Sequence, residues 1–191
     1  MAKFGTNKNC PIKQCRKFTV EGSTDRDYLK EYLEHLGVKG VKIEVANGKG
    51  NVINNLKKEY DARSGQEDVN LDVVCFYVDG DEQGYYGVVQ ELIGNGIQGG
   101  VECPPYYIHR KRKIIVGVVG DPEKGFSGSP ESLFLRGLGM EPTGNSQVDK
   151  KTFNKIKNRI TKEDKQRIFD YIDSKYCPDS KYCLPDDEKD E

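Results

Sequence analysis

The feature that most constrains this chain is a short apolar run, residues 71–78, that leads directly into two acidic residues. The run is rich in β-branched and aromatic residues, which is typical of a strand buried on both faces of a parallel sheet. Asp79 and Asp81 follow it on either side of a glycine. Open α/β sheets place their ligands outside the carboxyl ends of their strands. Two carboxylates at this position repel each other unless a cation lies between them, and Mg²⁺ prefers oxygen ligands of this kind.

Other short apolar runs alternate with segments that have the apolar periodicity of helices. Further strands are expected at residues 17–20, 41–45 and 114–119, with helices in the segments between the strands and another that starts near residue 131. This alternation predicts an α/β fold, with a largely parallel sheet of about four strands flanked by helices.

The length of 191 residues fits one domain with modest extensions. We expect an irregular lead-in at residues 1–16 and the α/β domain at 17–148. A small helical C-terminal extension is expected at 149–176, followed by a polar, acidic tail at 177–191.

Charge and hydropathy narrow the choice of compartment and partner. The formal net charge is −1, so any surface that binds nucleic acid must be a local patch. The first residues lack the apolar core of a signal peptide, and no apolar run approaches the roughly 18 residues of a membrane span. We therefore expect a cytoplasmic protein without a membrane partner.

The cysteines allow two interpretations. Cys75 lies in the central apolar run and is expected to be a core residue, whereas Cys10 and Cys15 lie near one end of the chain and Cys177 and Cys183 near the other. Free thiols are the expected state in a reducing cytosol. A four-cysteine zinc site that joins the two ends is the alternative, although the C-terminal spacing is wider than that of usual zinc motifs.

Acidic residues follow several of the expected strands. Glu21 follows the first strand, Asp79 and Asp81 the third and Asp121 the fourth, while Glu131 comes one short loop later. Because the carboxyl ends of parallel strands meet at one edge of a sheet, these carboxylates are expected to converge. Carboxylates without a Cys/His ligand set favour a hard divalent ion, Mg²⁺ or alternatively Mn²⁺. The chain has only two histidines, and neither belongs to a motif that indicates a catalytic triad.

Two motifs resemble a known family. Val20-Glu21-Gly22, followed by Thr24-Asp25 and an amphipathic helix, and then Val78-Asp79-Gly80-Asp81 resemble the toprim domain of topoisomerases, bacterial primases and several small nucleases. The resemblance runs from about residue 17 to residue 135. Gly128-Ser129-Pro130-Glu131 is similar to the additional acidic motif of the nuclease branch, which includes the overcoming-lysogenization-defect nucleases.

The resemblance implies a toprim-like fold and a role for each acid. Glu21 would act as general acid/base or metal ligand, and Asp79 and Asp81 would hold Mg²⁺. Glu131 and Asp121 would complete a second metal position, as a two-metal phosphodiesterase requires. The length of the chain favours the small nucleases over topoisomerases and primases.

Basic residues suggest where nucleic acid would bind. Lys49 lies in a glycine-rich turn that opens a helix, where backbone N–H groups favour a phosphate. The remaining candidates for contacts to a phosphate backbone are Arg110, Lys111, Arg112, Lys113, Lys151, Lys155 and Arg159. The alternatives are a simple turn at Lys49 and ordinary solvated faces at the other positions.

The sequence thus predicts a Mg²⁺-dependent nuclease that acts on DNA or RNA. A first alternative is a non-catalytic module of the same fold that binds nucleic acid or a partner protein. A second is another Mg²⁺-dependent phosphotransferase or phosphatase. The haloacid-dehalogenase-like phosphatases would have Thr or Val two residues after Asp81, where this chain has Gln83. Whether the protein forms homo-oligomers is left open.

Overall fold

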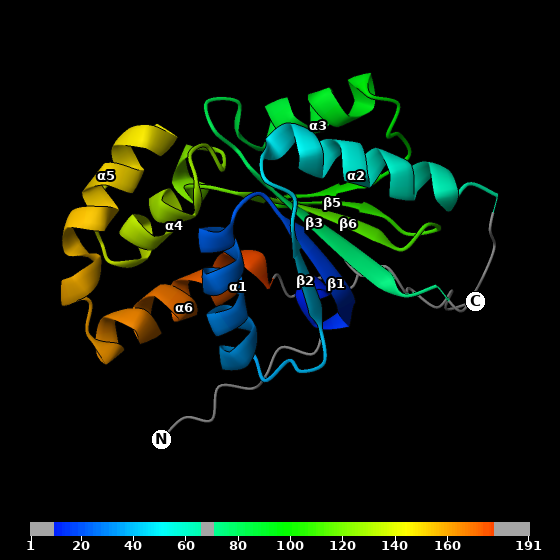
Figure 1. Ribbon diagram of the computed structural model, residues 1–191. Coiled ribbons are helices and arrows are strands. Elements are labelled where there is room, and N and C mark those ends of the chain that lie inside the picture. Colours follow the sequence, from blue (N-terminus) through cyan, green and yellow to red (C-terminus); the bar gives the residue numbers. More distant parts are fainter. Residues whose placement is uncertain (1–9, 66–70, 178–191) are drawn as a thin grey trace.

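Six strands form one sheet in the part of the chain that the structure describes, residues 10–65 and 71–177 of a computed structural model (Figure 1). The order of the strands across the sheet is β2-β1-β3-β6-β5-β4. Their bounds are β1 Cys15–Val20, β2 Lys42–Val45, β3 Val73–Asp79, β4 Val101–Cys103, β5 Tyr106–His109 and β6 Ile114–Val119.

Four of these strands are the ones that the apolar runs predict. β2, β1, β3 and β6 are mutually parallel, which confirms the α/β class and the largely parallel sheet. The expectation of about four strands is too low, because β4 and β5 extend the sheet as an antiparallel hairpin beside β6. The turn of this hairpin contains Pro104 and Pro105. Because proline favours an extended backbone at the residue before it, the local sequence indicates an extended segment but not its pairing in the sheet.

Helices cover both faces of the sheet (Figure 1). One face packs against α2, Lys49–Ala62, and α3, Gly84–Gly94. The opposite face packs against α1, Ser23–His35, α4, Pro130–Gly137, and α6, Lys162–Tyr176, with α5, Ser146–Ile156, beside α4. Short 3-10 helices lie at Pro11–Gln14, Pro122–Lys124 and Lys157–Arg159.

The central strand contributes to two cores. Side chains alternate along a strand, so Cys75 and Tyr77 belong to the core under α1 and α6, whereas Phe76 and Val78 belong to the core under α2 and α3. Both faces of β3 are thus buried, as the uninterrupted apolar run predicts.

The last helix packs into the same core as the sheet. Tyr176, the last residue of α6, is buried and donates a hydrogen bond of 2.8 Å from its hydroxyl to the Val118 carbonyl. Its hydroxyl also accepts the Gly120 N–H, and its backbone carbonyl accepts the Tyr106 hydroxyl. The end of the helix is therefore fixed against β5 and β6.

The cysteines differ from the expectation of free thiols. Cys10 and Cys177 form a disulfide that joins the start of the described chain to the end of α6. Cys103 is also disulfide-bonded, whereas Cys15 and Cys75 are free and buried. The free-thiol prediction is thus wrong for Cys10 and Cys177, and a four-cysteine zinc site is not formed, because these two sulfurs bond each other and Cys15 belongs to the core. Cys183 lies outside the described residues.

None of the helices in residues 10–65 and 71–177 combines the length and the apolar character that a membrane crossing requires.

Candidate active site

Two of the predicted carboxylates meet at the carboxyl edge of the sheet. Glu21 follows β1, and Asp79 ends the neighbouring strand β3. The backbone N–H of Asp79 donates a hydrogen bond of 3.1 Å to Oε1 of Glu21. The convergence expected from parallel strand ends is therefore present for this pair.

The turn after β3 positions Asp81. A Cβ atom at Gly80 would collide with the Phe126 carbonyl, so only glycine permits this close approach of the turn to the loop after β6. Asp81 itself has a left-handed backbone with φ of 47°. It exchanges two backbone hydrogen bonds of 2.8 and 2.7 Å with Gly128, which fix the turn against that loop.

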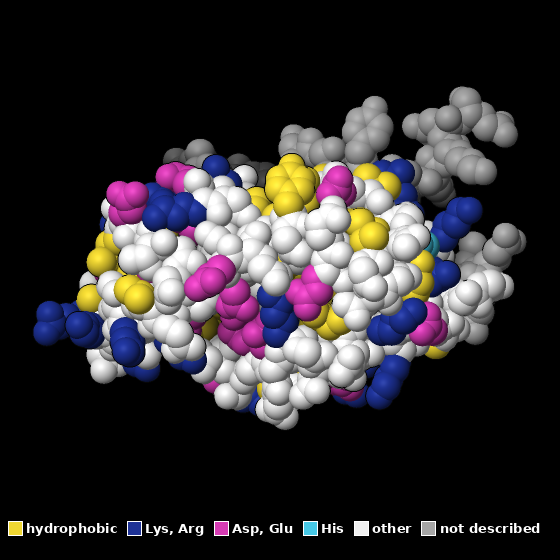
Figure 2. All heavy atoms as spheres, turned by 90° about the horizontal axis from the view of Figure 1, so that it is seen from above, with side chains coloured by type: hydrophobic (Ala, Val, Ile, Leu, Met, Phe, Trp, Pro, Cys, Tyr) yellow, Lys and Arg dark blue, Asp and Glu magenta, His cyan; other side chains and the backbone are white. Residues whose placement is uncertain are grey.

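The Asp81 carboxylate has two polar partners. The Ser146 hydroxyl donates a hydrogen bond of 2.7 Å to Oδ1, and Lys49 Nζ lies 3.5 Å from Oδ2. These residues line a polar cleft of about 350 Å³ together with Gln83 and Asn145. Figure 2 shows acidic side chains gathered near the middle of the face seen from above, with basic side chains beside them.

Burial and mutual repulsion change the protonation of the cluster. Burial raises the pKa of Glu21 to about 7, with further increases from the Asp81 and Asp25 charges, while the Asp79 N–H and Lys49 lower it. Burial also raises the pKa of Asp79 well above its ordinary value, and the neighbouring carboxylates, Glu21 first, raise it further. These carboxylates are therefore short of positive charge, which a bound cation would supply.

Asp25 and Glu131 lie at the border of the same cluster. Asp25 accepts the Gly22 N–H at 2.9 Å and so caps α1. Burial and the Glu131 charge raise the pKa of Asp25, and Glu131 also raises that of Asp79. Glu131 is buried and accepts the Ser129 hydroxyl at 2.8 Å. The structure thus brings Glu131 to the cluster and adds Asp25, which sequence reasoning did not place among the site residues.

Asp121 is engaged elsewhere, although it follows β6 at the same edge. Its fully buried carboxylate receives two hydrogen bonds from Arg136, of 3.0 Å from Nε and 2.8 Å from Nη2. It also accepts the Glu123 N–H and so caps a short 3-10 helix. Asp121 therefore holds the loop after β6 to α4, and its charge is compensated by a guanidinium.

Apart from Lys49, which lies beside Asp81, the predicted basic residues divide into two groups. Arg110, Lys111, Arg112 and Lys113 precede β6 and therefore lie at the edge of the sheet opposite to Glu21. The Arg112 guanidinium lies 3.5 Å from the centre of the Tyr60 ring and donates to the Tyr60 carbonyl.

The second basic group lies on the side of the carboxylates. Lys151 and Lys155 are exposed on α5, and the exposed Arg159 follows in the next 3-10 helix. Lys150, which precedes them, lowers the pKa of Asp25 through its charge.

Sequence reasoning missed the contact of Ser146 with Asp81, because no motif links this serine to a residue so distant in the chain.

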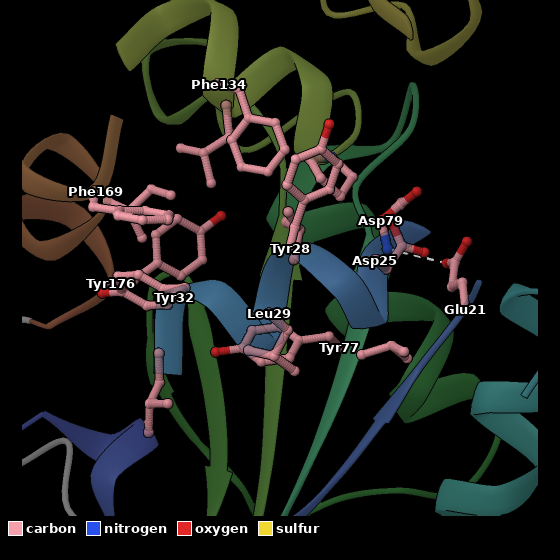
Figure 3. Close-up of a pocket in the computed structure, with 16 residues that line it drawn as sticks. Glu21, Asp25, Tyr28, Leu29, Tyr32, Tyr77, Asp79, Phe134, Phe169 and Tyr176 are labelled. Carbon is pink, nitrogen blue, oxygen red and sulfur yellow. Dashed lines mark hydrogen bonds between the residues drawn. The ribbon is translucent and has the colours of Figure 1, made fainter. Parts of the chain in front are cut away.

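An apolar cavity of about 70 Å³ begins at the carboxylates and extends beneath α1, α4 and α6. Figure 3 shows Glu21, Asp25 and Asp79 at one end of it and the rings of Tyr32 and Phe169 toward the other. The apolar wall limits the access of water to the carboxylates, which accounts for the effect of burial on their pKa values.

The donors that this site offers to a metal ion are carboxylate oxygens. Mg²⁺ is usually bound by one or two carboxylates, with water at the remaining positions. Asp79 offers one such carboxylate, with Glu21 beside it. Asp81 would supply the second carboxylate by giving up its contacts with Lys49 and Ser146. Within the described residues, Glu21, Asp79 and Asp81 do not bring three ligand atoms within 4.8 Å of one another.

Comparisons of this chain with protein-family models, with curated proteins and with solved structures found no match.

Proposed function

We propose that this protein is a Mg²⁺-dependent, toprim-like nuclease that hydrolyses nucleic-acid phosphodiester bonds. The observation that carries the proposal is the hydrogen-bonded pair of Glu21 and Asp79 at the carboxyl ends of adjacent parallel strands, with Asp81 one turn farther. This is the position at which open α/β sheets bind ligands. The raised pKa values of the pair support a cation as the missing partner.

The residues have distinct roles in this proposal. Asp79 and Asp81 hold Mg²⁺, which supplies electrostatic stabilisation to the phosphate oxygens when it is bound. Glu21, whose pKa of about 7 matches neutral pH, accepts and returns a proton as general base and acid. Lys49, beside Asp81, is positioned to contact a phosphate group in the polar cleft.

The nucleic-acid strand is proposed to follow the side of the molecule that carries α5. Lys151 and Lys155 are exposed there, and α5 begins at Ser146, which contacts Asp81. Arg110 and Lys111 lie at the opposite edge of the sheet and are not part of this path. Replacement of Lys151 and Lys155 by Ala should therefore weaken binding more than replacement of Arg110 and Lys111.

A nuclease assay tests the proposal directly. Wild-type protein is incubated with single- and double-stranded DNA and RNA in Mg²⁺ or Mn²⁺, beside the variants Glu21→Gln and Asp79→Asn. The matched control is Asp27→Asn, which removes an exposed carboxylate of α1 that pairs with the exposed Arg26 beside it. Cleavage by the wild type and the control, lost in both site variants, is the expected result. Metal-independent cleavage, or equal cleavage by all variants, contradicts the proposal.

The second candidate function is a non-catalytic module of the same fold. The observation that favours it is the engagement of both Asp81 oxygens by Ser146 and Lys49, which leaves this carboxylate fewer free positions for an ion. Such a module binds nucleic acid or a protein without Mg²⁺ and without cleavage. Binding of an oligonucleotide that is unaffected by a chelator, with no product formed, would favour this candidate over the nuclease.

A further inference from the structure

A second group of metal-ligand side chains lies between α1 and α6, apart from the carboxylate cluster. His35 is the last residue of α1, and Asp170 and Asp173 lie one turn apart on α6. Each of the three offers one ligand atom, and these atoms lie within 4.8 Å of one another. Among the residues of the described ranges, only this group of His, Cys, Asp and Glu side chains meets that condition.

The two inner donors lie slightly closer together than they would around a bound ion. His35 Nε2 lies 2.9 Å from Asp173 Oδ2. Two donors at the usual zinc distance of about 2.1 Å lie roughly 3.4 Å apart in a tetrahedral site. A widening of a few tenths of an ångström therefore admits an ion between His35 and Asp173. Asp170 is exposed and makes its side-chain contact to Gln166 within the same helix, so its carboxylate is able to turn toward the ion.

Neighbouring side chains orient the two inner ligands. The Tyr32 hydroxyl donates a hydrogen bond of 2.6 Å to Oδ1 of Asp173, which leaves Oδ2 directed at His35. The Phe169 ring lies 5.1 Å from the His35 ring and the Tyr32 ring 6.0 Å from it, which restricts the imidazole. Hydrogen bonds and packing behind the ligands are the support that protein metal sites generally require.

We propose that His35, Asp170 and Asp173 bind a zinc ion that links the end of α1 to α6. One imidazole with two carboxylates suits Zn²⁺, whereas Mg²⁺ and Ca²⁺ prefer ligand sets of oxygen alone. The exposed side of the site leaves a position for water. This inference is independent of the proposed nuclease function, since it uses none of the same residues.

The ion would act on the structure of the cavity wall. α1 contributes Tyr28 and Tyr32 to the apolar cavity, and α6 contributes Phe169 and Ile172. A ligand that binds the folded chain and not the unfolded chain raises the melting temperature. Zinc should therefore stabilise the packing of α6 on α1.

The experiment is a titration of metal-free, full-length protein with Zn²⁺ at pH 7.5, followed by calorimetry and by NMR of the histidine rings. The chain has two histidines, so the assignment is simple and His109 serves as an internal reference. We expect the ring signals of His35 to shift and those of His109, on β5, to stay unchanged. Zinc should also raise the melting temperature by several degrees.

Matched variants complete the test. His35→Gln and Asp170→Asn should each weaken zinc binding at least tenfold, whereas His109→Gln and the pair Asp79→Asn/Asp81→Asn should leave the affinity of this site unchanged. Asp170 is suited to this test, because it is exposed and its side chain accepts a hydrogen bond from Gln166 of its own helix, so its replacement should not affect folding. Unchanged His35 signals at saturating zinc, or equal affinity in the Asp170→Asn variant, would overturn the proposal.

Discussion

The backbone N–H of Asp79 donates a hydrogen bond to the side chain of Glu21 across the ends of two adjacent strands. This bond holds the carboxylate that follows β1 beside the last residue of β3, where both groups are partly removed from water. The same arrangement raises both pKa values, because burial and like charge disfavour ionisation. The pair is therefore expected to destabilise the metal-free fold at neutral and alkaline pH, as functional sites commonly do.

The first prediction concerns the stability of the metal-free protein when Glu21 is replaced by Gln. The pKa of Glu21 rises from its ordinary value of 4.5 to about 7 on folding. The folded state therefore binds more protons than the unfolded state between these values, and the free energy of unfolding falls as pH rises through that window. Glu21→Gln cannot ionise, so its free energy of unfolding should not fall in this way. The variant should be more stable than wild type at pH 8 by about 1 to 2 kcal/mol. This value is smaller than the full pKa change implies, because solvent screens the charge of a half-buried group.

Urea denaturation at pH 4.5 and pH 8 in the presence of a chelator measures this effect. The advantage of Glu21→Gln should be small at pH 4.5 and largest at pH 8, while Asp27→Asn should show little difference at either pH. A variant that is less stable than wild type at pH 8 would show that Glu21 stabilises the fold in its charged form.

The second prediction concerns the pH dependence of Mg²⁺ binding. Metal ligands must lose their protons to bind, and Asp79, one of the two proposed ligands, retains its proton to higher pH than an ordinary carboxyl group, as does the neighbouring Glu21. The affinity for Mg²⁺ should therefore rise several-fold between pH 6 and pH 8. Calorimetry at both values in buffers of different ionisation enthalpy should also detect proton release. An affinity that is independent of pH across this range would exclude Asp79 as a ligand with a raised pKa.

The third prediction separates Asp121 from the metal site. Replacement of Arg136 by Met leaves the buried Asp121 carboxylate without its guanidinium and should destabilise the protein by about 3 kcal/mol. The Mg²⁺ affinity of the folded variant should stay within about twofold of wild type. Arg26→Met is the control, because Arg26 is exposed and its guanidinium pairs with the exposed Asp27 beside it. Loss of Mg²⁺ binding in folded Arg136→Met would instead connect Asp121 to the site.

The fourth prediction tests the role of the last helix in the core. Tyr176→Phe removes a hydroxyl that connects the Val118 carbonyl and the Gly120 N–H, and it should lower the free energy of unfolding by about 1 to 2 kcal/mol. The control Tyr86→Phe alters a ring that is 67% exposed and should change stability little. Equal stability of the two variants would show that α6 is a peripheral addition to the sheet.

Local patterns in the sequence predict those strands and strand ends whose structure is determined by residues close together in the chain. The apolar run of β3 and the acids after β1 and β3 are recognisable because strand burial and the position of strand ends follow simple rules. The pairing of β4 with β5 is less accessible, since Tyr106 and Ile108 occupy too short a segment to distinguish a strand from an extended loop.

Contacts between distant residues follow no such rule. The partner of Asp121 is Arg136 on the next helix, and nothing in the intervening sequence indicates that pairing. The disulfide between Cys10 and Cys177 depends on the ends of the described chain meeting beside the sheet. Ser146 reaches Asp81 only because α5 begins at the border of the polar cleft.

Calorimetric titration of the wild type with Mg²⁺ at pH 8, beside Asp79→Asn/Asp81→Asn and the control Asp27→Asn, tests the central claim most directly. We predict that wild type and control bind Mg²⁺ with equal affinity, and that the double variant stays folded and loses binding by at least tenfold. Equal binding by all three proteins, or no binding by folded wild type at millimolar Mg²⁺ with or without an oligonucleotide, would contradict the account.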